Sequence, residues 1–319
     1  LTWVGDGFGN TWDTFSPLWT GTTTTFNTGD NVTFTDSGSA VPDIFVSETV
    51  QPFNMTVNNS AQPYLFYGEG ISTLGTLTKA GDNVLALTSP ANQFNGGVDI
   101  QAGTLSIGAG GGFGSLGSPV GITNNGVLRV NLASGGLALN MPISGSGAIE
   151  VTGGGATLIV RGTNSYTGLT TIDNECQLNI TTATALGTAD SGTVVLANGR
   201  LGVANELVGD MTVAEPIQVA GQGVTVAPGA LYVNTTGNNV TWAGPVTITG
   251  DARFRVVNPN VRMNFSNTVL GNNVALQCTV GNAAADANSV MSFQNTFSIG
   301  AGALTKDGQG IVEFLSNSN

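Results

Sequence analysis

Apolar residues along this chain come in short pairs separated by one polar position, a period of two that is typical of β-strands. From the middle of the sequence onward the pairs are Met211/Val213, Ile217/Val219, Val224/Val226, Leu231/Val233, Val240/Trp242, Val246/Ile248, Phe254/Val256, Val261/Met263, Val274/Leu276, Met291/Phe293 and Phe297/Ile299. They recur roughly every six to nine residues, and Gly, Asn, Asp, Pro and Ser fill the gaps between them. The pattern predicts short strands joined by tight turns.

Strands this short bury little apolar surface alone, so they need to stack. A β-sandwich would stack them, but its strands are usually longer and its loops wider. A solenoid fits the pattern better, because three short strands in each coil pair in parallel with their equivalents in the next coil. Three strands at this spacing give a coil of roughly 22 residues. The pattern therefore favours an all-β fold, a parallel β-solenoid.

Internal repeats support this choice. The stretch "LTKAGDNVLALTS", which begins at Leu77, aligns with "LTKDGQGIVEFLS", which begins at Leu304. A third copy begins at Ile149, and the alignment places Gly81, Gly153 and Gly308 at one position. The copies at Leu77 and Ile149 also continue alike, since "NQFNGGVDIQAGTLSIG" (92–108) matches "NSYTGLTTIDNECQLNI" (164–180).

These motifs resemble the autotransporter-associated β-strand repeat, which occurs in passenger regions of bacterial surface proteins and in large secreted proteins of similar type. The shared pattern is G-x-L-T-K-x-G-x-x-x-L-x-L, then N-x-Y/F-x-G-G/L-T-T-I, then G-x-L-x-I. The upstream stretch "TWVGDGFGNTWDTFSPLW" is similar to the usual lead-in to such repeats. Clear resemblance covers about a third of the chain. It implies a right-handed parallel β-helix and says little about activity.

The expected organisation is an aromatic-rich N-terminal cap with the first coils over residues 1–67, followed by a β-helix over residues 68–319. Repeats are expected at about 68–117, 144–187 and 299–319. The last copy stops at Asn319, where the first copy runs on into further strands. We expect a longer parent polypeptide or end-to-end stacking with other copies to complete that coil. The start at Leu1 likewise indicates a mature or excised piece.

Composition narrows the range of partners. Charged residues make up only 9% of the chain, its net charge is −12 and its pI is about 4.1. This balance argues against nucleic acid and against an anionic membrane surface, because phosphate binding needs a basic face. No apolar run reaches membrane-spanning length, so we expect no membrane insertion by this segment. The chain has no histidine, which removes the commonest general base and the commonest metal ligand.

The sequence contains few of the residue patterns that are typical of enzymes. Asp and Glu occur singly, whereas glycosidases need two carboxylates at set separations. There is no G-x-S-x-G, phosphate loop, C-x-x-C or Ca²⁺-binding nonapeptide repeat. We therefore expect no catalytic residue, no metal site and no cofactor. Acidic side chains distant in sequence can still converge in space, which leaves an enzyme open as an alternative.

The chain's two lysines, Lys79 and Lys306, fall at equivalent repeat positions near Asp82 and Asp307. A repeated lysine could belong to a binding array. We favour a scaffold role, in which the aliphatic stem covers the end of a coil and the ammonium pairs with a carboxylate. Replacement of either lysine by alanine should then change stability only slightly.

Three arginines are candidates for contact with a glycan or a partner: Arg253, Arg255 and Arg262. Arg253 and Arg255 flank Phe254 in an alternating pattern, so both should face outward. A small basic patch on an acidic protein can hold an anionic glycan. The alternative, which we favour, is a solvated face neutralised by Asp251.

Three tryptophans in the first nineteen residues, Trp3, Trp12 and Trp19, form the other candidate contact. Aromatic faces bind sugars, so they could make a carbohydrate platform. A β-helix also leaves its first coil open, and large rings plug that end well. We favour the plug.

Both cysteines are predicted to be part of the core. Cys176 alternates in phase with Leu178, and Cys278 alternates in phase with Leu276. In a strand this phase places both thiols inside, as small apolar groups.

Taken with the resemblance, these features predict a non-enzymatic structural protein on the outer cell surface of a bacterium or in its extracellular matrix. It would form part of a β-helical stalk, coat or fibre, with adhesion as an associated role. The alternative is a secreted β-helix that binds carbohydrate or degrades polysaccharide, with a surface polysaccharide as its partner.

Overall fold

The computed structural model describes residues 1–38, 41–173, 175–281 and 286–315. The regular elements in these residues are short strands that pair almost entirely in parallel, stacked as a β-solenoid of about twelve turns. The predicted fold class is confirmed. The chain divides into two compact units, Leu1–Gly135 with Asn140–Gly153, and Gly136–Leu139 with Gly154–Asn319. The last four residues of the repeat expected at 299–319 lie outside the described residues.

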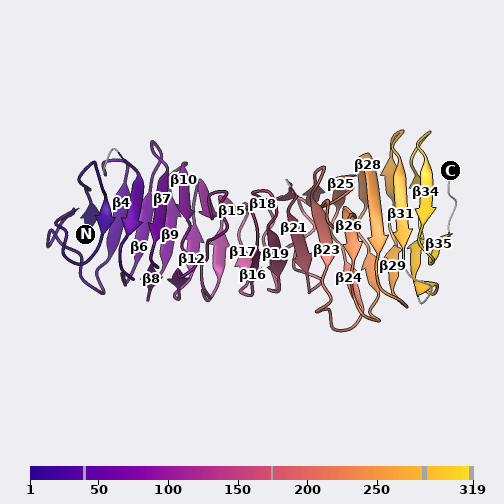
Figure 1. The fold of residues 1–319 in the computed structure, drawn as a ribbon, viewed down its shortest axis with the longest axis horizontal. Helices are drawn as coiled ribbons and strands as arrows, with labels where there is room; N and C mark the ends of the chain where they lie inside the picture. The colour runs from indigo at the N-terminus through magenta and orange to yellow at the C-terminus, as the bar shows by residue number, and fades with distance from the viewer. Residues whose placement is uncertain (39–40, 174, 282–285, 316–319) are drawn as a thin grey trace. The chain divides into compact units, whose positions relative to one another are not determined.

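Two long parallel ladders and one short pairing build the first unit (Figure 1). Ladder A contains β1 (Thr2–Trp3), β4 (Val32–Thr35), β6 (Met55–Asn58), β9 (Leu77–Ala80), β12 (Val98–Ile100), β14 (Ile122–Asn124) and β17 (Ile143–Ser144). Ladder B contains β2 (Thr11–Trp12), β5 (Asp43–Val46), β7 (Tyr64–Gly68), β10 (Val84–Leu87), β13 (Thr104–Ile107), β15 (Val127–Asn131) and β18 (Ala148–Thr152). The short pairing joins β8 (Ser72–Thr73) to β11 (Gln93–Phe94). From β4 onward, paired positions in ladder A are 21 to 24 residues apart, close to the expected coil length.

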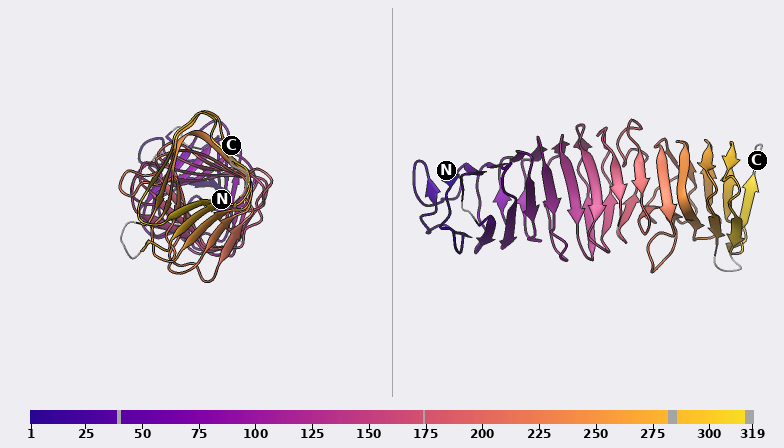
Figure 2. Two further views of the ribbon diagram at one scale, coloured as in Figure 1. Left: turned by 90° about the vertical axis from the view of Figure 1, so that its right-hand side faces the viewer. Right: turned by 90° about the horizontal axis from the view of Figure 1, so that it is seen from above.

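Three ladders build the second unit, and β28 (Val246–Val256) is long enough to serve two of them. Ladder C contains β16 (Gly136–Leu139), β19 (Thr157–Val160), β21 (Gln177–Ile180), β23 (Arg200–Val203), β26 (Leu231–Val233), the end of β28, β31 (Leu276–Val280) and β34 (Leu304–Asp307). Ladder D contains β20 (Thr170–Ile172), β22 (Thr193–Val195), β25 (Ile217–Gly221), the start of β28, β30 (Val269–Gly271) and β33 (Phe297–Ser298). Ladder E contains β24 (Met211–Val213), β27 (Val240–Trp242), β29 (Arg262–Phe265), β32 (Val290–Phe293) and β35 (Ile311–Phe314). Figure 2 shows, by colour, how the strands of neighbouring coils lie side by side within each unit.

The interior of the solenoid consists of rows of apolar side chains that stack from coil to coil. One row on ladder A runs through Val32, Met55, Leu77, Val98, Ile122 and Ile143. Each of these side chains is at most 3% exposed. Burial of one such side chain contributes about 1.5–3 kcal/mol, so stacking supplies the stability that a single short strand lacks. Cys176 and Cys278 are also fully buried, as predicted.

The predicted aromatic-rich cap is confirmed at the beginning of the first unit. β3 (Trp19–Thr20) turns back and pairs antiparallel with β1, which covers the free edge of ladder A. Trp3 and Trp12 both pack against Trp19, with ring centroids 5.0 and 5.4 Å apart, and Phe26 and Phe34 complete the cluster. These large rings fill the interior where no preceding coil is described.

A glycine with positive φ forms the corner within each copy of the repeated phrase, after its first strand. Gly81, Gly153 and Gly308 have φ values of +72°, +117° and +79°. The corner is also crowded by the neighbouring coil: a Cβ at Gly81 would overlap the carbonyl oxygen of Asn59 and lie 2.7 Å from its amide nitrogen. Glycine alone accommodates both the backbone conformation and the close approach.

The aligned copies lie in different ladders. Leu77 begins β9 in ladder A, whereas Ile149 belongs to β18 in ladder B, although both strands are part of the first unit. The repeated phrase therefore specifies a strand–corner–strand segment rather than one fixed face of the solenoid.

Lys79 departs from the expectation of a coil-covering side chain paired with a carboxylate. Its position in β9 points inward between Val57 and Ile100, and the side chain is fully buried. Its Nζ donates to the carbonyl oxygens of Ala80 (2.7 Å), Gly81 (2.6 Å) and Ala102 (3.3 Å). The expected carboxylate partner was wrong, because an inward lysine next to a corner meets backbone carbonyls instead.

Lys306, at the aligned position, is exposed and donates to the carbonyl oxygen of Gly308 (2.7 Å). The contact from lysine to the corner glycine is thus common to both copies, whereas burial is particular to Lys79. Burial lowers the pKa of Lys79 to about 8, although the carboxylates of Asp82 and Asp36 act in the opposite direction.

The apolar pair Val224/Val226 is not a strand. Val224 is buried, but Val226 is 99% exposed, and both lie in a loop between β25 and β26. The alternation predicted a strand here because period-two spacing over three residues does not distinguish a strand from an irregular loop.

Candidate functional site

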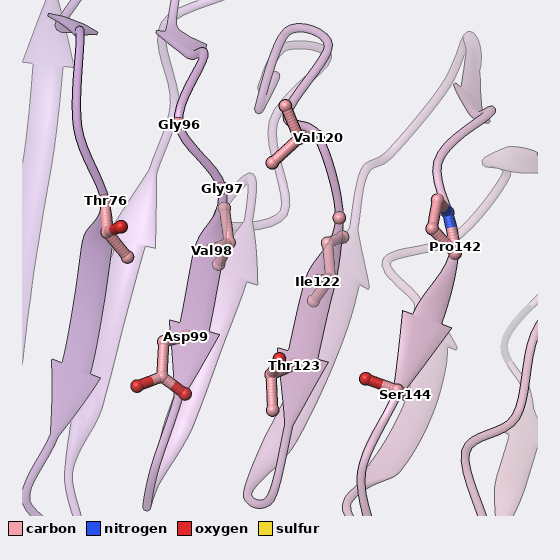
Figure 3. Close-up of a pocket in the computed structure, with 11 residues that line it drawn as sticks. Thr76, Gly96, Gly97, Val98, Asp99, Val120, Ile122, Thr123, Pro142 and Ser144 are labelled. Carbon is pink, nitrogen blue, oxygen red and sulfur yellow. The ribbon is translucent and has the colours of Figure 1, made fainter.

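A shallow hollow of about 300 Å³ lies on the outer side of ladder A in the first unit. Gly96, Gly97 and Gly121 are among the residues that line it. Figure 3 shows the side chains of Val120 and Pro142 toward one end of the hollow. Val120 is 73% exposed, so an apolar surface is available to a bound molecule.

Polar side chains from three neighbouring strands line the other part of this hollow: Asp99, Thr123 and Ser144 (Figure 3). They are consecutive partners in the parallel register of β12, β14 and β17. The same outward row continues through earlier strands as Thr2, Thr33, Thr56 and Thr78. Its members repeat about every 4.8 Å, the spacing of paired strands. The hollow thus sets a row of hydroxyl groups and one carboxylate beside an apolar wall.

The three tryptophans predicted as a glycan or partner contact lie in the cap cluster. Trp3 and Trp12 are fully buried and Trp19 is 2% exposed, so no ring presents a free face. Their packing agrees with the plug that we favoured.

Two of the three predicted arginines are neutralised by acids from later strands. Arg253 pairs with Asp307 (3.1 Å), and Arg262 pairs with Glu313. Asp251, the expected neutralising residue, instead accepts a hydrogen bond from the backbone of Ala275. Contact of these arginines with a glycan remains a prediction.

Arg255 has a different environment, because it shares an aromatic ring with Arg200, which sequence reasoning missed. Arg200, Tyr232 and Arg255 come from β23, β26 and β28, three consecutive strands of ladder C. The guanidinium carbon of Arg200 lies 4.1 Å from the Tyr232 ring centroid, and that of Arg255 lies 5.8 Å from it. No motif joins these residues in the sequence; only the register brings them together.

One buried acid has the raised pKa that often marks a catalytic group. Glu215 is 4% exposed, and its Oε1 accepts a hydrogen bond from the hydroxyl of Thr193 (3.0 Å). Burial raises the pKa of Glu215 to about 7, while the Thr193 hydrogen bond partly opposes the shift. The side chain lies in the interior beside Thr193, where a substrate has no access, so we interpret Glu215 as a structural group.

The pKa of Glu215 makes stability depend on pH. Its carboxyl has a higher pKa in the folded chain than in the unfolded chain, so folding takes up a proton between about pH 4.5 and pH 7. The free energy of unfolding should therefore fall as pH rises through this range. We expect Glu215→Gln to stabilise the chain at pH 8 by up to about 3 kcal/mol and to have little effect at pH 4. Urea unfolding at both pH values tests this, with Glu69→Gln, an exposed acid, as the control; equal effects of the two variants would contradict it.

No group of three His, Cys, Asp or Glu residues that could hold a metal ion occurs among the residues that the structure describes. In the same residues, no helix is long and apolar enough to cross a membrane.

Residues 77–107 and 146–174 match the family described as Passenger-associated-transport-repeat. Both stretches overlap the repeats identified at Leu77 and Ile149. They support an autotransporter passenger-like repeat protein, as the resemblance implied. No solved structure matches the chain.

Two curated proteins are similar to the chain. The Uncharacterized lipoprotein YdeK of Escherichia coli (strain K12) is 27% identical over 257 residues, which cover 79% of this chain and 17% of that protein. The Adhesin BmaC autotransporter of Brucella suis biovar 1 (strain 1330) is 30% identical over 184 residues, which cover 46% of this chain and 5% of that protein. The chain thus spans a small part of the length of both relatives.

Proposed function

We propose that this chain is a non-catalytic segment of a bacterial surface or secreted protein, where it serves as a rigid β-solenoid scaffold with a role in adhesion. The observation that carries the proposal is the division between interior and exterior. Inward rows consist mainly of closely packed apolar side chains, whereas the outward row of ladder A is made of hydroxyl groups and one carboxylate. Because each coil packs against its neighbours, the outward side chains are held in a fixed arrangement.

The passenger-type repeats and the named adhesin among the relatives support a surface location and an adhesive role. The low charge content and the absence of histidine support a passive surface rather than a catalytic one.

The test is immunogold labelling of intact bacteria with antibodies against this segment, together with adhesion assays on a strain that lacks it. We expect label on intact cells and reduced adhesion of the deletion strain. Absence of label on intact cells, or release of oligosaccharides from a polysaccharide by the purified chain, would overturn the proposal.

A second candidate function is binding of a neutral polysaccharide in the hollow on ladder A. The observation that favours it is the combination of the apolar Val120 with the hydroxyl groups of Thr123 and Ser144. Cleavage is disfavoured there, because Asp99 is the one acid that lines the hollow and glycosidases use two. Glycan-array binding that is lost in Thr123→Val and kept in Thr212→Val, an exposed threonine of β24, would support this function; equal binding by both variants would exclude it.

We also propose that a further parallel coil covers the last described one. Leu304 of β34 and Ile311 of β35 are 41% and 49% exposed. Their partners in the preceding coil, Leu276 and Val290, are 0% and 5% exposed. A coil from the same polypeptide or from another copy of the chain would bury the two exposed residues in the same way.

A further inference from the structure

The arginines of this acidic chain fall into two groups. Four of the six form ion pairs: Arg129 with Glu150, Arg161 with Glu206, Arg253 with Asp307 and Arg262 with Glu313. Arg200 and Arg255 form none with any carboxylate in the described part of the chain. The chain has 20 acids for 8 basic residues, so carboxylates are plentiful. The two unneutralised arginines nevertheless both lie near the ring of Tyr232: Arg255 is its partner in the next strand, and Arg200 lies two positions before Gly202, its partner in the preceding strand.

Burial makes these positive charges costly. Arg200 is only 4% exposed, and burial and the neighbouring Arg255 lower the pKa of Arg200 to about 10, while Tyr232 opposes the shift. The guanidinium therefore stays charged at neutral pH. Cation–π contact with the ring of Tyr232 offsets part of the cost, but it leaves the charge itself without a counterion.

Each arginine also has an N–H group without an acceptor. Arg200 donates from Nη1 to Oε1 of Gln177 (2.8 Å) and from Nε to the carbonyl oxygen of Gly229 (3.3 Å), but its buried Nη2 has no partner. Arg255 donates from Nη1 to the carbonyl oxygen of Pro228 (3.2 Å), and its buried Nε has no partner. Unpaired buried donors on two adjacent cations indicate a place for an anionic acceptor.

A loop of residues 222–229 supplies the two long carbonyl contacts. The loop is also held by a hydrogen bond from the backbone of Thr225 to the carboxylate of Glu175 (2.7 Å). Next to it lies a hollow of about 310 Å³, lined by Glu175, Gln177 and Val226 among others. Gln177 connects the hollow to Arg200 through its hydrogen bond. An anion that enters from the hollow replaces neutral carbonyl acceptors with charged ones, which form stronger hydrogen bonds with guanidinium.

We propose that Arg200, Tyr232 and Arg255 form a binding site for the carboxylate or sulfate group of an acidic polysaccharide, entered by displacement of the loop of residues 222–229. Guanidinium groups suit such an anionic group, because arginine donors match the geometry of its oxygens. The rest of the surface is acidic and repels densely charged polymers such as nucleic acid. A polysaccharide such as polygalacturonate carries one carboxylate per sugar ring, which is a lower linear charge density than the one charge per about 1.7 Å of double-stranded DNA, so it meets less repulsion.

The inference goes beyond the proposed scaffold role and does not depend on it, since the purified chain is enough to test it. Binding is measured by isothermal titration calorimetry with polygalacturonate, with dextran as the neutral polymer and sodium sulfate as the free anion. We expect polygalacturonate to bind, dextran not to bind at this site, and added salt to weaken the interaction. Sulfate should compete with polygalacturonate.

Arg255→Gln is the decisive variant, because Arg255 is half-buried and its replacement keeps a hydrogen-bonding side chain. We expect at least a tenfold loss of affinity for polygalacturonate, and a larger loss in Arg200→Gln/Arg255→Gln. Arg129→Gln removes an ion-paired arginine from the first unit and should leave binding unchanged. Circular dichroism verifies that each variant is folded.

Several results would overturn the proposal. These are absence of polygalacturonate binding, equal binding of dextran, equal affinity in folded Arg255→Gln, or an equal loss in Arg129→Gln. Binding of sulfate without binding of polygalacturonate would mean an adventitious ion only, and would also overturn it.

Discussion

Replacement of Gly81 by alanine is expected to lower the free energy of unfolding by about 3 kcal/mol, the sum of a strained left-handed residue and an overpacked contact. The backbone at Gly81 has a φ of +72°, which a residue with a Cβ rarely adopts. The added methyl group would also overlap the backbone of Asn59 in the neighbouring coil. Backbone atoms of a paired strand move only if hydrogen bonds between the strands break. The strain therefore cannot be relieved without a large cost in free energy. Chemical denaturation of the purified chain measures the effect.

Two other glycines of the first unit separate these contributions. Gly7 has a φ of +75° but open space around its Cβ position, so Gly7→Ala should cost only about 1 kcal/mol. Gly111 has neither a positive φ nor a neighbour within 4 Å, so Gly111→Ala should change stability by less than about 0.5 kcal/mol. If Gly81→Ala costs no more than Gly7→Ala, the corner is not crowded as described.

Replacement of Lys79 by alanine is expected to lower the free energy of unfolding by about 3 kcal/mol, because it removes a packed aliphatic stem and the donor of two part-buried carbonyl oxygens. Those acceptors are the carbonyls of Gly81 and Ala102, whereas the carbonyl of Ala80 keeps a hydrogen bond from the backbone N–H of Asn59. This replaces the small effect that the sequence predicted for both lysines. Urea denaturation at pH 7 measures the change.

The matched control is Lys306→Ala, which removes the same residue from the aligned position. Lys306 is exposed and donates a hydrogen bond to the carbonyl oxygen of Gly308, so its loss should cost less than about 0.5 kcal/mol. Lys79→Met, which keeps most of the stem, should fall between the two alanine variants. Equal effects of Lys79→Ala and Lys306→Ala would show that burial of the ammonium does not matter.

The fold was predictable because its signals are local. Alternation within a strand places Phe254 inside and Arg253 and Arg255 outside, and the structure confirms the burial of Phe254. The repeated phrase predicted a common segment, and its aligned glycines are corners in every copy. Pairs such as Val224/Val226 mislead, because two apolar residues alone do not specify a strand.

The arginine–tyrosine cluster was only partly predictable. Alternation identified Arg255 as outward-facing, but Arg200 lies more than fifty residues earlier in the chain. Its place beside Tyr232 depends on the register of β23 with β26, whose paired positions are 30 residues apart instead of the expected coil length. The extra length is in the loop segments between the strands, and strand periodicity gives no information about the length of a loop.

In the solenoid described above, each further coil adds one strand to a ladder, and that strand pairs in register with the strand of the preceding coil. Spin labels at Thr33→Cys with Thr123→Cys, and at Thr33→Cys with Ser144→Cys, test this directly within the first unit, after replacement of Cys176 and Cys278 by alanine. In ladder A these pairs are four and five strands apart. The account predicts narrow distance distributions in pulsed electron resonance, corresponding to backbone separations of about 19 and 24 Å, one strand spacing apart. Equal mean distances for the two pairs, or a shorter distance for the pair with Ser144→Cys, would contradict the parallel, in-register solenoid.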